Sequence, residues 1–403
     1  ATLGMAFRDG KPLCLSALGR ELPGLAPEET VVYAPTAGVQ ALRTGWKEGL
    51  LRKNPSLKGS DFSLPVVVPG ITAGISYIAD LFLDEGQTIL AGEPSWDNYG
   101  LIFAERRGAI LRGIPLFGEG RSGPGLDLAA FEAALEEEAA SGTVRIILNF
   151  PHNPSGYTPS RAEAEALLRM VEKTAASGAP VLAICDDAYF GLFYEEETAG
   201  ESLFGRLASL HDKVLAVKID GPTKEDYVWG LRIAFISIGG RGLDEAARGA
   251  LEKKLMGAIR SSVSCANTSA QYLALKTAAD PATAAEKGAF FELLQSRYRA
   301  VKDFLAKNPP PPGLEILPFN SGYFMCFRCR RSGAGRAGPG AAGRTGSDAA
   351  GRAEAIRQIL LKKGIGAIAL GDEYLRITFA AVEEAEIPGL YRAVYEAAKE
   401  AAG

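Results

Sequence analysis

Short apolar runs alternate along most of the chain with longer segments in which apolar residues recur every three or four positions. Runs that are apolar at almost every position are typical of strands buried on both faces of a sheet, and the periodic segments are typical of helices. The runs predict strands at 65–70, 87–92, 109–116, 144–150, 180–186, 214–220 and 232–239. The periodic segments predict helices at 71–83, 127–140, 160–177 and 243–260. We therefore expect an α/β fold whose large domain has a mainly parallel seven-stranded sheet wrapped by helices.

The pattern changes after NPPPPG at 308–313 and predicts a smaller α+β domain there. Its expected elements are strands at 314–319, 323–329 and 374–380 and helices near 351–363 and 383–400. Residues 330–351 are rich in Gly, Ala and Arg, a composition that buries little surface and predicts a mobile loop. The predicted organisation is an N-terminal segment at 1–45, the large domain at 46–300 and the small domain at 301–403.

Length and composition favour a globular protein, because the chain has 403 residues of which 47% are hydrophobic. Lys and Arg number 44 against 48 Asp and Glu, and a net charge of −4 does not favour nucleic acid or an anionic membrane as a partner. No apolar run reaches the roughly 18 residues that span a bilayer. Residues 1–12 lack the basic and apolar parts of a signal peptide, so we expect a cytoplasmic protein.

The cysteines and histidines do not predict a metal site. Cys326 and Cys329 form a Cys-x-x-Cys pair without a second pair nearby, so burial is favoured over structural zinc. His152 and His211 are too few for a histidine-rich metal site. We expect reduced, mostly buried thiols at Cys14, Cys185, Cys265, Cys326 and Cys329.

Polar and aromatic residues follow several of the predicted strands, at the sheet edge where ligands of open α/β folds collect. Ile71 and Thr72 open a helix, whose backbone N–H groups and Thr72 hydroxyl suit a phosphate, although many such turns only cap a helix. Trp96 and Tyr99 follow the next strand, where an aromatic ring either stacks on a flat ligand or packs in the core.

The two central strands are followed by an amide and by acids. The loop PHNPSG leaves the Asn153 amide able to form hydrogen bonds. Asp186, Asp187 and Tyr189 end an otherwise apolar strand, and an acid there either pairs with a protonated ring nitrogen or caps the turn. Lys224 lies further along the chain, and a lysine can hold an aldehyde as a Schiff base.

These motifs, in this order, resemble those of the fold type I pyridoxal-phosphate enzymes, and specifically the class I/II aminotransferases. The motifs are NPSG at 153–156, Asp-x-Ala-Tyr at 186–189, and Lys224 followed by Gly-x-Arg at 230–232. The resemblance extends from about residue 13 to 395. It implies that the large domain binds pyridoxal 5′-phosphate and that the substrates are an amino acid and a 2-oxo acid.

The resemblance also implies a role for each matching residue. Lys224 would hold the cofactor as a Schiff base and later move a proton between the substrate and the cofactor. Asp186 would hold the proton of the pyridinium ring, and Tyr189 and Asn153 would bond the phenolic oxygen. Trp96 would stack on the ring, and the phosphate would be bound by Ile71, Thr72, Thr223 and Arg232.

Lys213 and Lys218 are the alternatives to Lys224, but neither has an arginine eight residues later that precedes a strand, as Arg232 does. The chain departs from the family at Gly221, where a serine usually donates a hydrogen bond to the phosphate. The two acids and the Trp of EDYVWGL (225–231) have no assigned role, and for His152 we expect a hydrogen bond within its loop.

Substrate and subunit contacts are implied at the two ends of the chain. Arg376, within an apolar strand, matches the arginine that binds the substrate α-carboxylate, and a structural salt bridge is the alternative. Gly19 matches an entry segment near that carboxylate, within a segment that packs with the small domain and the partner subunit. Tyr33 matches a tyrosine that reaches the neighbouring subunit's phosphate, which implies a homodimer with shared active sites.

Arg260 is a candidate match for an arginine that binds a distal carboxylate, but the residues after it diverge, and a solvent-facing arginine near a helix end, the alternative, is common. If Arg260 has this role, the donor is aspartate or glutamate; otherwise aromatic and aliphatic amino acids remain open. The expected activity is amino-group transfer in two stages. A C–S or other β/γ lyase on the same fold is an alternative. The effector domain of an aminotransferase-like transcription regulator is disfavoured, because the entry segment follows the first residues with no basic helix-turn-helix before it.

Overall fold

A computed structural model describes residue 2 and residues 4–118, 125–330 and 351–402, so the predicted loop at 330–351 falls almost entirely outside the described residues. The contacts divide the chain into two compact units. The larger unit comprises Cys14–Asn153 and Tyr157–Ala289. The smaller unit comprises the residues up to Leu13, Pro154–Gly156 and Phe290 onward.

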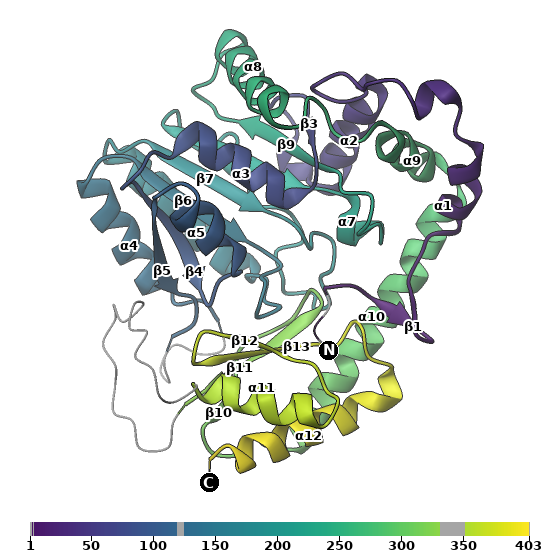
Figure 1. The fold of residues 1–403 in the computed structure, drawn as a ribbon. Helices are drawn as coiled ribbons and strands as arrows, with labels where there is room; N and C mark the ends of the chain where they lie inside the picture. The colour runs from purple at the N-terminus through teal and green to yellow at the C-terminus, as the bar shows by residue number, and fades with distance from the viewer. Residues whose placement is uncertain (1, 3, 119–124, 331–350, 403) are drawn as a thin grey trace. The chain divides into compact units, whose positions relative to one another are not determined.

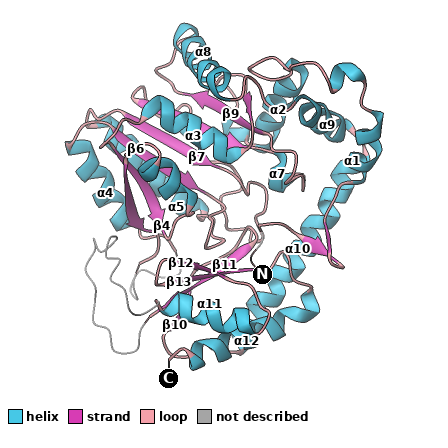
Figure 2. Ribbon diagram, viewed as in Figure 1, coloured by secondary structure: helices cyan, strands magenta, loops and turns pink. Residues whose placement is uncertain are grey.

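A seven-stranded sheet forms the centre of the larger unit, in the order β3-β9-β8-β7-β6-β4-β5 (Figures 1 and 2). Five neighbouring strands run parallel, whereas β9 is antiparallel to both β8 and β3. The predicted α/β fold with a mainly parallel seven-stranded sheet is therefore confirmed. The strands are β3 (Val66–Val68), β4 (Thr88–Glu93), β5 (Ile110–Pro115), β6 (Val144–Asn149), β7 (Val181–Asp186), β8 (Val214–Asp220) and β9 (Ala234–Gly239).

Helices pack along this sheet, and several of them begin at polar caps. Asp127 and Asp244 each accept a backbone N–H at a helix start, and Ser160 forms a capping box with Glu163. Helix α3 packs against β8 and β9, α4 against β5 and β6, and α5 against β7 and β8. The four predicted helices are α3 (Ile71–Phe82), α4 (Leu128–Ala140), α5 (Arg161–Ala176) and α8 (Glu245–Ser262). The larger unit also contains α2 (Gln40–Lys53) and α9 (Thr268–Ala279).

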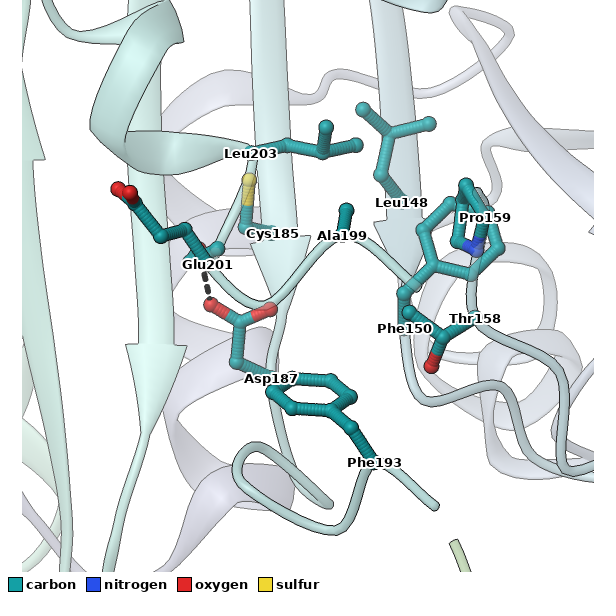
Figure 3. A pocket seen from close by; sticks show the side chains of 11 residues that line it. Leu148, Phe150, Thr158, Pro159, Cys185, Asp187, Phe193, Ala199, Glu201 and Leu203 are labelled. Carbon is teal, nitrogen blue, oxygen red and sulfur yellow. Dashed lines mark hydrogen bonds between the residues drawn. The ribbon is translucent and has the colours of Figure 1, made fainter. Parts of the chain in front are cut away.

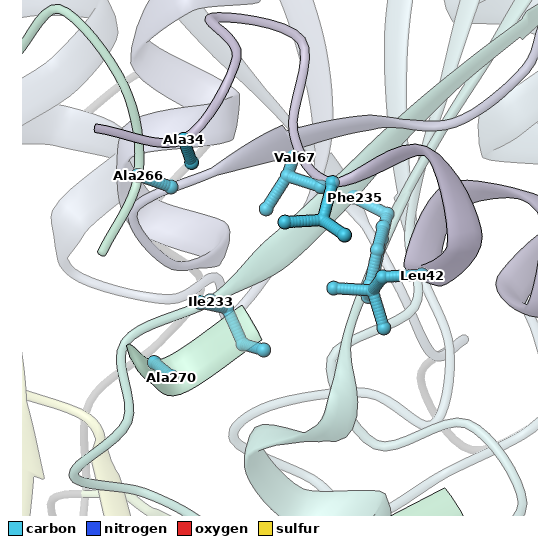
Figure 4. Packing of buried hydrophobic residues seen from close by; sticks show 8 residues of the cluster. Ala34, Leu42, Val67, Ile233, Phe235, Ala266 and Ala270 are labelled. Carbon is cyan, nitrogen blue, oxygen red and sulfur yellow. The ribbon is translucent and has the colours of Figure 1, made fainter. Parts of the chain in front are cut away.

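Part of the core lies where α2 and α9 meet β3 and β9, and Figure 4 shows its side chains converging. Val67 and Phe235 on the paired strands are fully buried there, beside Leu42 of α2 and Ala270 of α9. The Trp46 ring stacks on Phe235, with 4.1 Å between centroids. This packing fixes the start of β9 and the face of α2 that carries Trp46.

The smaller unit contains a four-stranded antiparallel sheet in the order β10-β11-β13-β12. Its strands are β10 (Leu314–Ile316), β11 (Phe324–Cys329), β12 (Ile368–Leu370) and β13 (Tyr374–Thr378), and its helices include α11 (Arg352–Lys362) and α12 (Ile387–Glu400). The elements of this unit that were not predicted are the short strands β1 (Phe7–Arg8), β2 (Lys11–Pro12) and β12, and the 26-residue helix α10 (Ala282–Lys307), whose first residues belong to the larger unit.

All five cysteines are free, and Cys185, Cys326 and Cys329 are buried. Cys326 and Cys329 are three positions apart in β11, so their side chains point to opposite faces of the sheet. Cys14 is exposed and Cys265 is half-buried, so Cys14 is not the core residue that its apolar neighbours predict. Among the described helices, none combines the length and the apolar character needed to cross a membrane.

We predict that Phe235→Ala lowers the free energy of unfolding by about 3–5 kcal/mol, because it leaves a cavity beneath the Trp46 ring. Urea unfolding followed by circular dichroism measures this change. Leu51→Ala, at a partly exposed position of α2, serves as the control and is expected to change stability by less than about 1 kcal/mol. Equal effects of the two substitutions would contradict this account of the core.

Candidate active site

The carboxyl end of β7 places the Asp186 carboxylate in the interior of the larger unit. The Tyr99 hydroxyl donates a hydrogen bond of 2.5 Å to it, and the Ala188 N–H donates one of 3.3 Å. Burial raises the pKa of Asp186 to about 6, against the opposing effects of Tyr99 and the Lys224 charge. The site therefore holds a carboxylate that favours a positively charged partner.

Lys224 and Tyr189 lie beside this carboxylate. Lys224 is in the short helix α7 (Pro222–Glu225), and its Nζ lies 4.9 Å from the centroid of the Tyr189 ring. The Lys224 charge also lowers the pKa of Asp186, so the amine is electrostatically coupled to the acid. Three of the residues predicted from the motifs are thus brought together.

The loop after β6 is tied to the end of β7 through Asn149. Its Nδ2 donates to the Asp186 carbonyl oxygen at 2.8 Å, and its Oδ1 accepts the Asn153 N–H at 2.8 Å. This pair of bonds fixes Asn153 relative to Asp186. Asn149 was not predicted as a site residue, although its position two residues before the Pro-His-Asn turn marks the strand end.

His152 has the loop role that was expected. Its backbone N–H donates to the Tyr157 carbonyl at 2.8 Å, and its ring hydrogen-bonds the backbone at Pro94. Burial lowers the pKa of the imidazole to about 3, so the ring is neutral at physiological pH. His152 therefore supports the loop without contributing a charge.

Arg232 lies at the start of α3. An added Cβ on Gly70, the residue before α3, would lie 2.6 Å from Arg232 Nη2, so the guanidinium rests against the Gly70 backbone. Ile71 and Thr72 supply the first backbone N–H groups of the helix, and Arg232 Nη1 donates to the Trp229 carbonyl at 3.4 Å. A guanidinium at a helix N-terminus favours a phosphate-sized anion.

The structure explains why Gly221 stands where a serine is usual in the family. A Cβ at this position would lie 2.9 Å from Ala234 Cα and 3.0 Å from the Ile233 carbonyl oxygen. The backbone of Gly221 is extended, with φ 169°, a conformation open to any residue. The requirement for glycine is therefore a lack of space against the start of β9.

Aromatic side chains flank the Asp186 carboxylate on the side of β4. Trp96 packs edge-on against Tyr99, with 5.5 Å between centroids and 82° between planes. Tyr99 directly precedes a π-helical turn, η4 (Gly100–Glu105), a feature frequent at functional sites. Burial and the Asp186 charge raise the pKa of Tyr99 well above its usual value, so it remains a hydrogen-bond donor. The bond from Tyr99 to Asp186 was not predicted, because only an aromatic beside a turn is visible in the sequence.

The two acids after Lys224 now have partners. Lys53 of α2 forms a salt bridge with Glu225, and Lys287 of α10 forms salt bridges with both Glu225, at 3.3 Å, and Asp226. These bonds attach the turn that carries Lys224 to two helices distant in sequence. Burial opposes ionisation of Glu225, but the two lysine charges outweigh it and lower the pKa to about 2.

The two other lysines considered have different surroundings. Lys213 is exposed and its Nζ donates to the Gly178 carbonyl at 2.7 Å. Lys218 is fully buried and forms salt bridges with Asp187 and Asp220. The amines of Lys213 and Lys218 are therefore each bonded to other groups of the protein.

The remaining predicted residues lie on other elements, apart from Thr223, which is buried beside Lys224. In the larger unit, Gly19 on α1 (Ser16–Glu21), Tyr33 and Arg260 of α8 are exposed, and Tyr33 has 87% of its surface accessible. Arg376 is half-buried on β13 of the smaller unit. Its guanidinium lies 4.3 Å from the Phe324 ring centroid and donates to the Thr2 carbonyl at 3.1 Å.

Comparison with known families agrees with this arrangement of residues. The model of the family described as aminotransferase class I and II matches residues 7–394. The chain belongs to this family. It is therefore an aminotransferase, and the reaction class inferred from its motifs is confirmed.

Individual relatives of this aminotransferase are distant in sequence. A probable aspartate/prephenate aminotransferase of Aquifex aeolicus is 25% identical over 89% of this chain and 82% of its own length. An aminotransferase structure from Anaerococcus prevotii has a TM-score of 0.82 at 20% identity, covering 100% of this chain and 90% of its own. An alpha-aminoadipate aminotransferase from Thermus thermophilus, complexed with N-(5′-phosphopyridoxyl)-L-leucine, has a TM-score of 0.75 at 20% identity, covering 99% and 92%. The two structures support the same fold.

The salt bridges of Glu225 generate a prediction about pH. The unfolded-state pKa of a glutamate is about 4.5 and the folded value is about 2, so the stabilisation by ionised Glu225 is complete above pH 4.5 and is lost as the pH falls toward 2. We expect Glu225→Gln to lower the free energy of unfolding of this aminotransferase at pH 7, and to lower it progressively less below pH 4.5. Urea unfolding at a series of pH values measures the difference.

Glu48→Gln, at an exposed position of α2, is the matched control and should change the unfolding free energy little at any of these pH values. A constant difference between wild type and Glu225→Gln from pH 7 to pH 3 would contradict the assignment.

Proposed function

We propose that this aminotransferase binds pyridoxal 5′-phosphate covalently through Lys224 and moves an amino group between an L-amino acid and a 2-oxo acid. The observation that carries the proposal is the buried Asp186 carboxylate beside Lys224 and Tyr189. When bound, the cofactor supplies an aldehyde that accepts amino groups and a ring that withdraws electrons from the substrate. The family match and the phosphopyridoxyl group of the Thermus thermophilus structure support this choice.

The residues present fit such a cofactor at both of its ends. The raised pKa of Asp186 shows that its charge is costly without a cationic partner, which a protonated ring nitrogen would provide. We assign Tyr189 and Asn153 to the phenolic oxygen and Trp96 to the ring face. The phosphate would be bound by Arg232 with Ile71, Thr72 and Thr223.

Each of these residues then has a defined task in the reaction. The Lys224 amine accepts the proton from the substrate Cα and returns it at the next stage. Asp186 holds the proton on the ring nitrogen, and the Tyr99 hydroxyl holds the Asp186 carboxylate in one orientation. The neutral His152 keeps the adjacent Asn153 in place without adding a competing charge.

Arg376 is the proposed ligand of the substrate α-carboxylate. It lies on the face of its sheet shared with Phe324 and Tyr374, whereas Phe327 and its neighbours pack against Tyr391 and Tyr395 of α12. A guanidinium is planar and matches the geometry of a carboxylate, to which it can form a two-pronged bond, and that of Arg376 lies over the Phe324 ring. The arrangement therefore suits an α-amino acid.

The identity of the amino acid follows from what binds its side chain. We keep aspartate or glutamate as the proposed donor, with Arg260 as the ligand of the distal carboxylate and Gly19 near the α-carboxylate. The named relatives do not select one substrate, because one is an aspartate/prephenate enzyme and another is an alpha-aminoadipate enzyme bound to a leucine derivative. The exposed Val31 and Tyr33 favour a homodimer in which Tyr33 reaches the partner's phosphate site.

A panel of single amino acids tests the proposed reaction. The purified protein loaded with pyridoxal phosphate should absorb visible light, and only its amino donors should change that absorption as the amino group is transferred. A response confined to aspartate and glutamate, and lost in Arg260→Met, would support the distal-carboxylate role. Release of ammonia and a 2-oxo acid without the absorption change would instead indicate a lyase.

Lys224→Ala is expected to abolish the linkage that borohydride reduction fixes between protein and cofactor, measured as a mass increase of the intact chain. Lys213→Ala is the control and should retain the full mass increase, because Lys213 is an exposed lysine bonded to the Gly178 carbonyl. Persistence of the linkage in Lys224→Ala would contradict the assignment.

Gly70→Ala tests the proposed phosphate site. The added methyl would displace the Arg232 guanidinium, and alanine is also strained at a φ of +90°, so we expect the affinity for pyridoxal phosphate to fall roughly 10- to 100-fold. Fluorescence titration of the cofactor-free protein measures the affinity. Gly249→Ala, in open space on α8, should bind as the wild type does; an unchanged affinity in Gly70→Ala would remove Arg232 from the phosphate site.

A further inference from the structure

Lys218 is a buried cation that the proposed reaction does not use. It lies in the middle of the sheet on β8 and none of its surface is accessible. Its Nζ forms a salt bridge with the Asp187 carboxylate, lies 3.4 Å from Asp220 Oδ2, and is 4.6 Å from the centroid of the Phe190 ring. A buried ammonium with two carboxylates is costly to assemble, so its position invites an explanation.

Lys218 contacts two acids that lie close in sequence to proposed active-site residues. Asp187 directly follows Asp186, and its backbone N–H donates to the Ile219 carbonyl of β8 at 2.9 Å. Asp220 ends β8 and directly precedes the Gly221 turn that leads to Lys224. One ammonium therefore joins the end of the strand that carries Asp186 to the start of the turn that carries Lys224.

Asp187 also contacts a hydroxyl and a small pocket. Ser202 Oγ donates a hydrogen bond of 2.5 Å to Asp187 Oδ2, the same oxygen that faces Lys218. The carboxylate also borders a small pocket whose walls are largely apolar (Figure 3). The walls include Leu148, Phe150, Phe193 and Leu203. Lys218 is thus the positive charge in direct contact with Asp187.

The charge of Asp187 acts on Asp186. Burial raises the pKa of Asp186, and the neighbouring Asp187 carboxylate raises it further. The opposing effects come from the Tyr99 hydrogen bond, the Lys224 charge and the Ala188 N–H, which lower this pKa. Burial opposes the charge of Lys218, but Asp187 and Asp220 outweigh it and raise the pKa of Lys218, so the ammonium remains charged. Asp220 has a second partner in Trp46, whose Nε1 donates to it at 3.0 Å.

We propose that Lys218 is a positioning residue for the cofactor ring: by neutralising Asp187, it lets the adjacent Asp186 stay ionised and hold a protonated ring nitrogen. This inference rests on the proposed role of Asp186. Without Lys218, the buried carboxylates of Asp187 and Asp220 lose the ammonium that faces both of them, while Asp186 keeps the charge of Lys224 nearby. The cluster then takes up a proton, part of which resides on Asp186, and the bond to the ring nitrogen weakens.

A purely structural ion pair makes a different prediction. If Lys218 only stabilises the fold, its loss weakens the binding of every ligand of the site to the same degree. If it acts through Asp186, its loss weakens only ligands that carry a ring nitrogen. A pyridoxal-phosphate analogue with carbon in place of the ring nitrogen separates the two, because it retains the aldehyde and the phosphate.

The experiment measures the affinities of the cofactor-free protein for pyridoxal phosphate and for this analogue at pH 7.5, by fluorescence titration. The wild type should bind pyridoxal phosphate more tightly, and Lys218→Met should reduce the ratio of the two affinities, by about tenfold for each unit by which the pKa of Asp186 comes to exceed the pH of the measurement. Lys218→Met/Asp187→Asn, which removes both charges of the pair, should restore the ratio. Lys47→Met, at a half-buried lysine bonded to the Phe62 carbonyl, should leave it unchanged.

Asp187→Asn alone gives a second measurement that does not require Lys218→Met to fold. Lys218 keeps Asp220 as a partner in this variant, and removal of the Asp187 charge lowers the pKa of Asp186. The preference for pyridoxal phosphate over the analogue is lost as the pH falls through the pKa of Asp186. Because that pKa is lower in Asp187→Asn, the preference should persist to lower pH in this variant than in the wild type. In Lys218→Met it should be lost at higher pH.

An unchanged ratio in folded Lys218→Met, or an unshifted pH dependence in Asp187→Asn, would overturn the role of Lys218. A wild type that does not distinguish the two ligands would overturn the ring-nitrogen role of Asp186 itself, and this inference with it. A shared loss of affinity for both ligands in Lys218→Met would assign Lys218 to the fold alone.

Discussion

The site depends on the balance of buried charge at the carboxyl ends of β7 and β8. Asp186, Asp187 and Asp220 are all buried there, and a carboxylate removed from water is stable only beside a cation or several hydrogen-bond donors. Tyr99 bonds Asp186, Lys218 pairs with both Asp187 and Asp220, and Trp46 also bonds Asp220. Because these partners come from three separate elements, the geometry of the site is coupled to the packing of the whole larger unit.

The turn that carries Lys224 likewise depends on side chains from distant elements. Its short helix has only four residues and cannot hold its own position, so neighbouring helices do so. Trp46 and Lys53 lie seven positions apart on one face of α2; Trp46 bonds Asp220, before the short helix, and Lys53 bonds Glu225, its last residue. Lys287 adds a contact from α10. The turn is held at both ends by side chains outside it.

Much of the fold and part of the site could be predicted from the sequence because local patterns determine them. Apolar runs mark the strands, and the residues that follow Val68, Asn149 and Asp186 mark the ligand edge of the sheet. The partners of those residues could not be predicted. Tyr99 is 87 positions from Asp186, and Lys53 is 172 positions from Glu225, so only the packed structure brings them together. The need for glycine at position 221 could not be predicted either, because the atoms that exclude a side chain there belong to β9 and to the residue before it.

The close approach of Gly221 to β9 also limits how this chain can change. The atoms nearest to an added Cβ are the Ala234 Cα and the Ile233 carbonyl oxygen, which every residue type possesses. No single replacement at 233 or 234 would remove them, so a side chain at 221 requires the backbone at the start of β9 to move. A substitution at position 221 is therefore also a change in how β9 is packed.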